Sequence, residues 1–296
     1  MKTCAKTRKI VPLVLALLLL FGGCSAVNRA AVFGTNGNET TRRQDVLTVE
    51  FLDVGQANAA LLTCGGKSLL IDGGKVKNNQ KLIARLKELE VDHLDAVICS
   101  HPDEDHCGGL AAVLAKYPAE HVYSSVTEYT TKVFSNVVKY ADEQGHPVEV
   151  PQTGDSWTLG SASVQVIGPV QTYSDPNNGS LVLRVDYGET SFLFTGDMGI
   201  TAEDELVESG ARLDATVLKV GHHGSSTSSS ADFLRAVRPD CALISCGEGN
   251  SYGHPEQVVL DRLEAIGAAV YRTDRDGTIR AVCDGKTIEI TTERTS

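Results

Sequence analysis

The stretch that decides the fold is Leu94-Asp95-Ala96-Val97-Ile98-Cys99-Ser100-His101-Pro102-Asp103-Glu104-Asp105-His106-Cys107-Gly108-Gly109. Its first part is apolar and rich in strand-forming residues, which predicts a buried strand over 94–99. Four candidate metal ligands follow at once, on what the alternate spacing predicts to be an extended turn. They are His101, Asp103, Asp105 and His106. Because α/β folds place their sites at the carboxyl ends of strands, we expect these side chains to converge there.

Three more apolar, strand-like segments end in polar residues followed by a small one. They are Leu70-Ile71-Asp72-Gly73-Gly74, Phe194-Thr195-Gly196-Asp197 and Val217-Leu218-Lys219-Val220-Gly221-His222-His223-Gly224-Ser225. A single run of this kind is compatible with a solvated acidic loop, because Asp, Glu and Pro are ordinary turn residues. Four such strand ends in one chain favour a shared site instead.

Strand-like segments and helical patterns continue from about Val46 to the C-terminus. The predicted strands are 46–54, 58–63, 67–72, 94–99, 121–125, 162–168, 180–187, 190–196, 214–220, 241–246, 269–272 and 278–283. The predicted helices are the pattern over 82–89 and the segments 107–115, 130–143, 202–208, 230–237 and 256–266. Many strands with helices spread between the hairpins predict an α/β (α+β) fold, a four-layer αββα sandwich of two sheets covered by outer helices.

The motif over 101–106 resembles the H-x-H-x-D-H signature of the metallo-β-lactamase superfamily, with Asp103 in place of the second histidine. The chain further resembles the soluble hydrolase domain of ComEC-type DNA-uptake (competence) proteins over about residues 46–291. This closer resemblance rests on five motifs: His101-Pro102-Asp103 with Asp105-His106, Asn177-Asn178-Gly179-Ser180-Leu181-Val182-Leu183, His222-His223-Gly224-Ser225, Asn250-Ser251-Tyr252-Gly253-His254-Pro255 and Thr273-Asp274-Arg275-Asp276-Gly277.

The resemblance implies a metal centre with two ions. It makes His101 and Asp103 ligands of one ion, Asp105, His106 and His223 ligands of the second, and Asp197 the bridging carboxylate. The usual third histidine of the first site is missing, and its place falls at Asn178 or Ser180, so a single bound ion stays an alternative. Imidazole favours zinc, whereas carboxylates favour manganese or magnesium. Zinc and manganese are therefore the leading candidates, with magnesium as a third.

Two further residues are candidates for roles close to the metal. The resemblance suggests that Asp72 orients a metal ligand, although a turn Asp before Gly-Gly is an equal alternative. His254 is a candidate to hold a scissile phosphate or to protonate a leaving group, and the alternative is an ordinary loop histidine. Together with Asp105, His254 is our candidate catalytic residue.

The segment 217–225 contributes weaker candidates. His222 is a poorer candidate ligand than His223, because consecutive side chains on an extended segment point to opposite sides. We keep His222 as a residue that supports the ligands or contacts substrate. Lys219 and Ser225 are candidate phosphate contacts, although a serine-rich loop is more often simply a loop.

The N-terminus has the features of a signal peptide over residues 1–23, with basic residues followed by an apolar run over 10–21. This run is shorter than the roughly 20 residues that span a bilayer. The ending Gly22-Gly23-Cys24 resembles the bacterial lipobox, which predicts lipidation at Cys24 and an anchor on the extracellular face of the cytoplasmic membrane. Ordinary secretion is the alternative. Residues 24–45 lack hydrophobic periodicity and are expected to form a flexible tether before a hydrolase domain over 46–296.

Composition sets limits on the function. The chain has 296 residues, 42% of them hydrophobic, which is enough for one large core. Its formal net charge of −11 opposes nucleic-acid binding except where metal ions or local basic residues offset it. The absence of a C-x-x-C pair excludes a zinc ribbon. An exported protein can form disulfides, but Cys99 and Cys246 lie in apolar strand-like runs, where buried free thiols are at least as compatible.

These observations predict an exported, metal-dependent hydrolase. The resemblance favours a phosphodiesterase or nuclease that acts on extracellular DNA with a metal-activated water. One alternative is the hydrolysis of β-lactams or other amides and esters, which Asp103 disfavours because those enzymes have a histidine-rich zinc site. The other alternative is a non-catalytic surface lipoprotein that binds DNA or assists DNA uptake.

Overall fold

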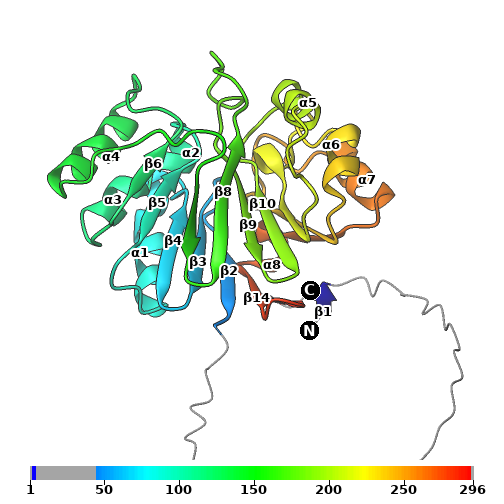
Figure 1. The fold of residues 1–296 in the computed structure, drawn as a ribbon, viewed down its shortest axis with the longest axis horizontal. Helices are drawn as coiled ribbons and strands as arrows, with labels where there is room; N and C mark the ends of the chain where they lie inside the picture. The colour runs from blue at the N-terminus through cyan, green and yellow to red at the C-terminus, as the bar shows by residue number, and fades with distance from the viewer. Residues whose placement is uncertain (1, 5–44, 295–296) are drawn as a thin grey trace, which may run out of the picture. The chain divides into compact units, whose positions relative to one another are not determined.

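The computed structural model describes residues 2–4 and 45–294 (Figure 1). Cys24, the apolar core of the predicted signal peptide and the predicted tether lie outside the described residues. Within the described part of the chain, no helix is both long enough and apolar enough to cross a bilayer.

Two mixed β-sheets form the centre of the fold. The first has the order β1-β15-β14-β2-β3-β4-β5-β6, and the second has the order β13-β12-β11-β10-β9-β8-β7. The strands of the first sheet are β1 (Lys2–Cys4), β2 (Leu47–Phe51), β3 (Ala60–Cys64), β4 (Lys67–Ile71), β5 (Ala96–Cys99), β6 (Val122–Ser124), β14 (Ile279–Cys283) and β15 (Ile288–Thr292). Those of the second are β7 (Ser156–Leu159), β8 (Ala162–Gly168), β9 (Val182–Tyr187), β10 (Thr190–Phe194), β11 (Val217–Lys219), β12 (Cys241–Ile244) and β13 (Ala269–Arg272).

Helices cover the outer faces of the sheets (Figure 1). Beside the first sheet lie α1 (Asn79–Glu88), α3 (Leu110–Leu114) and α4 (Lys132–Glu143), and beside the second lie α5 (Ile200–Glu208), α6 (Ala231–Val237) and α7 (Gln257–Ala265). Shorter helical segments are η1 (Val76–Asn78), α2 (Glu104–Cys107), η2 (Gly221–Gly224) and α8 (Thr273–Asp276).

The core consists of three apolar clusters, which correspond to the three interfaces of a four-layer fold. One cluster joins residues from both sheets, such as Phe51, Leu183 and Phe192. The other two join each sheet to its own helices. The end of strand β4 is apolar without interruption because both of its faces are buried. Leu69 and Ile71 belong to the cluster between the sheets, whereas Leu70 packs against helices. The predicted αββα sandwich is confirmed.

The sequence predicted most elements, with local differences. Strands β1, β7 and β15 were not predicted, and β1 falls in the segment assigned to a signal peptide, where Lys2–Cys4 pairs with β15. Strand β7 is an edge strand, and its residues Ser156–Thr158 are at least partly exposed, so it lacks an apolar pattern. The prediction of a single helix over 107–115 is wrong at its start. Helix α2 begins at Glu104, and Gly108-Gly109 separates it from α3.

The buried thiols agree with the sequence analysis. Cys99 and Cys246 are free and buried, and so are Cys64, Cys107 and Cys283. Desolvation, and to a smaller extent the nearby Asp274 carboxylate, raises the pKa of the Cys246 thiol to about 12. A thiol with a raised pKa is a poor nucleophile and a poor metal ligand. These cysteines therefore act as core residues.

Candidate metal centre

The loop after β5 brings four polar side chains to one edge of the first sheet. His101 follows the strand closely, and Asp103 is the N-cap residue of α2, with φ −72° and ψ 148°. Asp105 and His106 lie on α2 itself. The predicted extended turn is therefore wrong for its second half, because the backbone turns into a helix at Glu104. The helical turn brings the ligand atoms of Asp105 and His106 within 4.8 Å of each other and of His223.

The loop after β4 packs directly on α2 and its C-terminal glycines. Gly73 donates a backbone hydrogen bond of 2.7 Å to the carbonyl of His106, and Gly109 donates one of 3.0 Å to Gly74. A Cβ atom at position 109 would lie only 2.0 Å from the carbonyl oxygen of Gly73, so this contact requires glycine. The close approach sets Asp72 beside His106, and Asp72 itself adopts the left-handed region with φ 60°.

His106 is held by its Nδ1 atom. This nitrogen lies 2.8 Å from Oδ2 of Asp72 and 3.1 Å from Oγ of Ser100, and Ser100 also donates its own backbone N–H to Asp72 at 2.8 Å. A carboxylate that accepts a hydrogen bond from Nδ1–H leaves Nε2 of the imidazole as the metal-binding atom. Asp72 thus occupies the position from which the sequence analysis expected it to orient a ligand.

The other two candidate histidine ligands are oriented in the same way. Nδ1 of His101 lies 3.3 Å from Oγ of Ser180, which comes from the second half of the chain, and Nδ1 of His223 lies 2.8 Å from the carbonyl oxygen of Ser245. Both histidines are buried. In all three imidazoles the Nδ1 side faces the protein, so the Nε2 side is directed into the centre.

The atoms that face the centre have no hydrogen-bond partner. Nε2 of His101, His106 and His223 and Oδ1 of Asp197 are buried and unpartnered. Ligand atoms of His101, His106 and Asp197 lie within 4.8 Å of one another, and so do those of Asp105, His106 and His223. Buried polar atoms without hydrogen bonds are costly, and apart from ion pairs between the imidazoles and carboxylates of the centre these four have no partner. Divalent cations at the two groups would bind all four. The residues therefore fit the metal centre that the resemblance implies.

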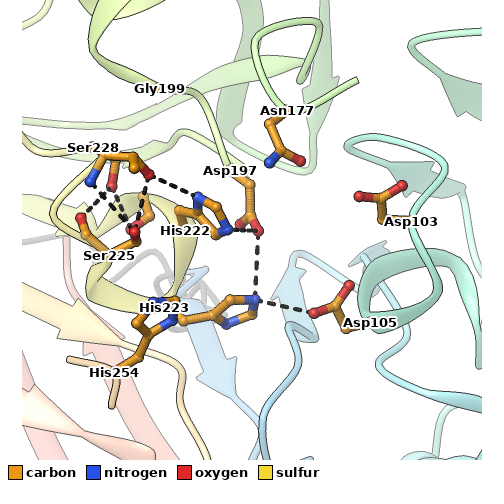
Figure 2. A network of polar contacts seen from close by, with 12 residues as sticks. Asp103, Asp105, Asn177, Asp197, Gly199, His222, His223, Ser225, Ser228 and His254 are labelled. Carbon is orange, nitrogen blue, oxygen red and sulfur yellow. Dashed lines mark hydrogen bonds and ion pairs between the residues drawn. The ribbon is translucent and has the colours of Figure 1, made fainter. Parts of the chain in front are cut away.

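Asp197 lies between the two groups of ligand atoms. Its Oδ1 is 3.2 Å from Nε2 of His106, and its Oδ2 is 3.5 Å from Nε2 of His223 (Figure 2). Asp105 approaches the same His223 atom at 3.4 Å. Asp197 follows β10, and its backbone N–H donates to Oγ of Ser180 at 3.1 Å. This geometry is the one expected of a bridging carboxylate.

The electrostatics of the centre depend on burial and on the nearby charges. Burial, followed by the neighbouring His106, lowers the pKa of His101 to about 3. Burial also disfavours a charged His106, but Asp197 and Asp72 outweigh it and hold the pKa of His106 well above its ordinary value. Burial opposes ionisation of Asp197, yet His106 and His223 keep its pKa well below the usual range. A cation that binds here would displace the proton of His106.

Asp103 occupies a more open position than the other candidate ligands. Its side chain is 39% exposed, and its Oδ2 lies 3.7 Å from Nε2 of His101. Burial and the charge of Asp105 raise the pKa of its carboxyl. Asp103 faces Nε2 of His101, the residue that the resemblance assigns to the first ion. Its carboxylate belongs to neither group of closely spaced ligand atoms.

The two residues proposed for the place of the missing histidine face elsewhere. Ser180 lies behind His101, on the Nδ1 side, and Oδ1 of Asn178 accepts a 3.1 Å hydrogen bond from the backbone N–H of Gly199. The sequence analysis missed Asn177, whose Oδ1 is buried without a hydrogen-bond partner. Figure 2 shows the Asn177 side chain between Asp103 and Asp197. Its place in the Asn177-Asn178-Gly179-Ser180 motif was the available clue.

His222 does not point away from the centre as an extended segment would require. His222 and His223 lie on η2 with φ 46° and 56°, so the segment is not extended and the two side chains do not point to opposite sides. Nε2 of His222 lies 3.8 Å from Oδ2 of Asp197, and its Nδ1 lies 3.2 Å from Oγ1 of Thr227 (Figure 2). His222 therefore faces Asp197, the candidate bridging carboxylate, and is itself partly exposed.

The structure does not support phosphate contacts by Lys219 and Ser225. Lys219 is 5% exposed, and its Nζ donates a 2.8 Å hydrogen bond to the carbonyl of Val220. Burial lowers its pKa. Ser225 is equally buried and bonds to Thr227 at 2.9 Å within its own turn. Both side chains stabilise the loop that carries His223 and are not directed toward solvent.

His254 lies at the mouth of the centre. Its ring stacks 6.4 Å from that of His223 at an interplanar angle of 17°, and its centroid is 5.7 Å from that of His222. Gln56 contacts its Nδ1 at 3.4 Å, and Asn250 binds its backbone. Burial, then the charges of the two neighbouring histidines, lowers its pKa. A partly exposed imidazole in this place can contact a substrate.

A groove adjoins the other side of the centre. Its volume is about 420 Å³, and Pro102, Gly179 and Leu181 form part of its wall next to the metal ligands. Tyr129 and Tyr173 line it farther out, with no Lys, Arg, Asp or Glu in the lining. This volume lies within the range of roughly 300–1,000 Å³ typical of small-molecule sites. The groove is therefore large enough for a small molecule, and it borders the segment that carries His101 and Asp103 without being lined by either residue.

Relatives among curated proteins carry the names of competence and recombination proteins. The chain is 35% identical to "Competence protein ComA" of Neisseria gonorrhoeae over 231 residues, which is 77% of this chain and 31% of that protein. It is 30% identical to "ComE operon protein 3" of Bacillus subtilis and 33% identical to "Recombination protein 2" of Haemophilus influenzae, covering 78% and 83% of this chain and 32% and 30% of those proteins. The chain spans about a third of the length of these relatives. They confirm the predicted resemblance to competence proteins.

The fold has counterparts among solved structures, and the family is clear from the sequence. The metallo-beta-lactamase fold protein YhfI from Bacillus subtilis matches with a TM-score of 0.52 and 14% identity, over 77% of this chain and 96% of that one. At this identity the likeness shows the fold alone. The sequence itself matches the metallo-beta-lactamase superfamily over residues 52–248. The chain belongs to the metallo-beta-lactamase superfamily.

Proposed function

We propose that this protein is a metal-dependent phosphodiesterase that hydrolyses DNA. The observation that carries the proposal is the set of buried ligand atoms on His101, His106, His223 and Asp197, which have no hydrogen-bond partner and fall into two closely spaced groups that share His106. The names of the competence and recombination relatives support DNA as the substrate. A groove beside the centre leaves room for a polymer to approach.

The residues of the centre divide the work of hydrolysis. When bound, divalent ions at this centre supply an activated water and stabilise charge on the phosphate oxygens. Asp72 keeps Nδ1 of His106 protonated and its Nε2 available. Asp105, 3.4 Å from Nε2 of His223, is placed to orient the attacking group. His254 lies beside His223, where its imidazole can donate a hydrogen bond to the scissile phosphate.

A phosphodiesterase is favoured over a β-lactamase by the ligand chemistry. Asp103, Asp105 and Asp197 supply carboxylates where a histidine-rich zinc site would have more nitrogen ligands. Carboxylate oxygens suit hard cations such as manganese and magnesium, which commonly serve phosphoryl chemistry. Zinc remains compatible with the three imidazoles.

The proposal is tested with the purified mature protein, stripped of metal and then reloaded with Zn²⁺, Mn²⁺ or Mg²⁺. We expect cleavage of single- or double-stranded DNA and of a chromogenic phosphodiester with at least one of these ions, and none in EDTA. Nitrocefin is the matched substrate for the amide-hydrolase alternative. Intact DNA and intact phosphodiester with all three ions, or faster turnover of nitrocefin, would contradict the proposal.

We further propose that the protein is exported and held at the membrane through Cys24. The basic start, the short apolar run and Gly22-Gly23 before Cys24 support this location. Cys24→Ala should release the protein from the membrane fraction or block its maturation, whereas Cys4→Ala should not. Fractionation of cells that express each variant measures this. A wild-type protein that never sediments with membranes would favour ordinary secretion.

A further inference from the structure

Tyr252 is a large aromatic residue that the fold leaves in solvent. Its side chain is 64% exposed, although most of the chain's aromatic rings are buried or partly buried. The loop that carries it is firmly held: Nδ2 of Asn250 donates to the carbonyls of Gly247 and His254, at 2.9 and 2.6 Å, and the N–H of His254 donates to Oδ1 of Asn250 at 3.0 Å. An exposed ring on a pinned loop is available for contact at little ordering cost.

The position of Tyr252 ties it to the metal centre. Its ring stacks on His254 with centroids 5.7 Å apart and an interplanar angle of 29°, and His254 in turn stacks on the candidate ligand His223. Tyr252 is therefore two ring contacts from the metal-binding Nε2 atom of His223. A group one nucleotide away from a phosphate at the centre would meet this ring.

A cation lies beside the same ring. Nζ of Lys75 is 5.9 Å from the centroid of Tyr252. Lys75 follows the β4 loop that carries Asp72, whereas Tyr252 belongs to the loop after β12, so the pair joins the two halves of the fold at the mouth of the centre. The ligand set itself is acidic, with Asp103, Asp105 and Asp197, and the whole chain has a net charge of −11. A local cation offsets this charge for an incoming phosphate.

Stacking suits this environment because it does not depend on net charge. Proteins that hold single-stranded nucleic acid place bases on aromatic side chains and phosphates beside lysine or arginine. A base inside a duplex is stacked between its neighbours and cannot cover a protein ring. We propose that Tyr252 stacks on an unpaired nucleobase next to the scissile phosphate, while Lys75 contacts the adjoining phosphate. This inference rests on the proposed phosphodiesterase function and specifies how its substrate is held.

The test compares Tyr252→Ala with wild type and Tyr252→Phe, all loaded with the same metal. The substrates are an oligothymidylate and an oligonucleotide of equal length with abasic residues around the cleavage site. Stacking on one aromatic ring changes binding by about tenfold to a hundredfold per base. We expect Tyr252→Ala to raise the KM for oligothymidylate by that factor, with little change in kcat and little change on the abasic strand. Tyr252→Phe should behave as wild type.

Two matched variants separate this role from general damage. Tyr140, on α4, has Lys139 5.1 Å from its ring centroid, so Tyr140→Ala and Lys139→Ala remove the same kinds of groups at another place. Lys75→Ala should lower the slope of log Kd for oligothymidylate against log salt by about 0.7, the value for one phosphate contact on a single strand, and Lys139→Ala should leave it unchanged.

Equal losses on the normal and abasic strands, or an unchanged KM in Tyr252→Ala, would overturn the proposal. Fluorescence anisotropy with the same two strands measures binding without cleavage, so the stacking proposal is tested independently of the proposed activity. If no strand is cleaved but binding still depends on Tyr252 and on the bases, the phosphodiesterase proposal fails and the stacking site stands. If the strands are cleaved but binding does not depend on Tyr252 or on the bases, the phosphodiesterase proposal stands and the stacking site fails.

Discussion

The inner and outer parts of the metal centre differ in how they are held. The inner set, defined as His101, His106, His223 and Asp197, is buried, and each member contributes an atom without a hydrogen-bond partner. The outer set, defined as Asp103, Asp105, His222 and His254, is partly exposed, with side chains of Asp103 and Asp105 that are 39% and 27% exposed.

Hydrogen bonds behind the imidazoles fix the inner set independently of any ion. Asp72, Ser180 and Ser245 occupy the Nδ1 positions, so the three Nε2 atoms are oriented before a cation arrives. In the outer set, Nδ1 of His222 and Nδ1 of His254 also have partners, on Thr227 and Gln56, but all four side chains are partly exposed. We infer from this difference that the inner set decides whether a metal binds. The outer set adjusts which metal binds and how the substrate contacts the centre.

The largest effect is expected from Asp197→Ala. This change removes the carboxylate that lies 3.2 Å from His106 and 3.5 Å from His223, between both groups of ligand atoms. We expect metal affinity and hydrolysis to fall by more than about a hundredfold, since even residues behind the ligands contribute tenfold to a hundredfold. Metal content after dialysis and initial rates measure this. Asp142→Ala, at an exposed position on α4, is the control. Two ions still bound to the Asp197 variant would show that this residue is not a bridge.

An intermediate effect is expected from Asp72→Asn, which alters the support of the inner set without touching a ligand. The amide keeps the shape of the side chain but removes the charge that accepts the Nδ1 proton of His106 at 2.8 Å. Metal affinity should fall by about tenfold to a hundredfold. Isothermal titration with Zn²⁺ and Mn²⁺ measures it, and Asp95→Asn, at a carboxylate just before β5, serves as the control. Unchanged affinity would mean that Asp72 is only a turn residue.

The smallest effect on affinity is expected from Asp103→His, in the outer set. The change restores the H-x-H-x-D-H pattern and adds an imidazole near Nε2 of His101, 3.7 Å from the present carboxylate. Because imidazole suits zinc better than manganese, the ratio of zinc to manganese affinity should rise, by roughly tenfold or less. Competition between the two ions measures the ratio. A ratio equal to that of wild type would place Asp103 outside the coordination of the ion.

The sequence was most informative where ligands are contiguous or close a strand. The run 101–106 and the strand ends at Asp72, Asp197 and His223 were identified because their chemistry repeats after apolar segments. The layered fold was predictable for the same reason, since strands buried on both faces have uninterrupted apolar sequences.

Other features depend on backbone geometry that a pattern does not reveal. The left-handed conformations of His222 and His223 could not be inferred from two adjacent histidines, and they turn both rings toward Asp197. The early start of α2 and the inward side chain of Asn177 depend on contacts between loops that are far apart in the sequence. Burial of Lys219 likewise follows from the packing of the two sheets and not from its neighbours in the chain.

The central claim is that the four unpartnered atoms of the inner set hold metal ions, and metal analysis of the reconstituted protein tests it most directly. The protein is stripped with chelator, incubated with Zn²⁺ or Mn²⁺, separated from free ions by gel filtration and measured by plasma mass spectrometry. One or two ions should remain per wild-type chain, and none in His106→Ala, because His106 belongs to both groups of ligand atoms. A wild-type protein that stays folded by circular dichroism but retains no ion would contradict the claim.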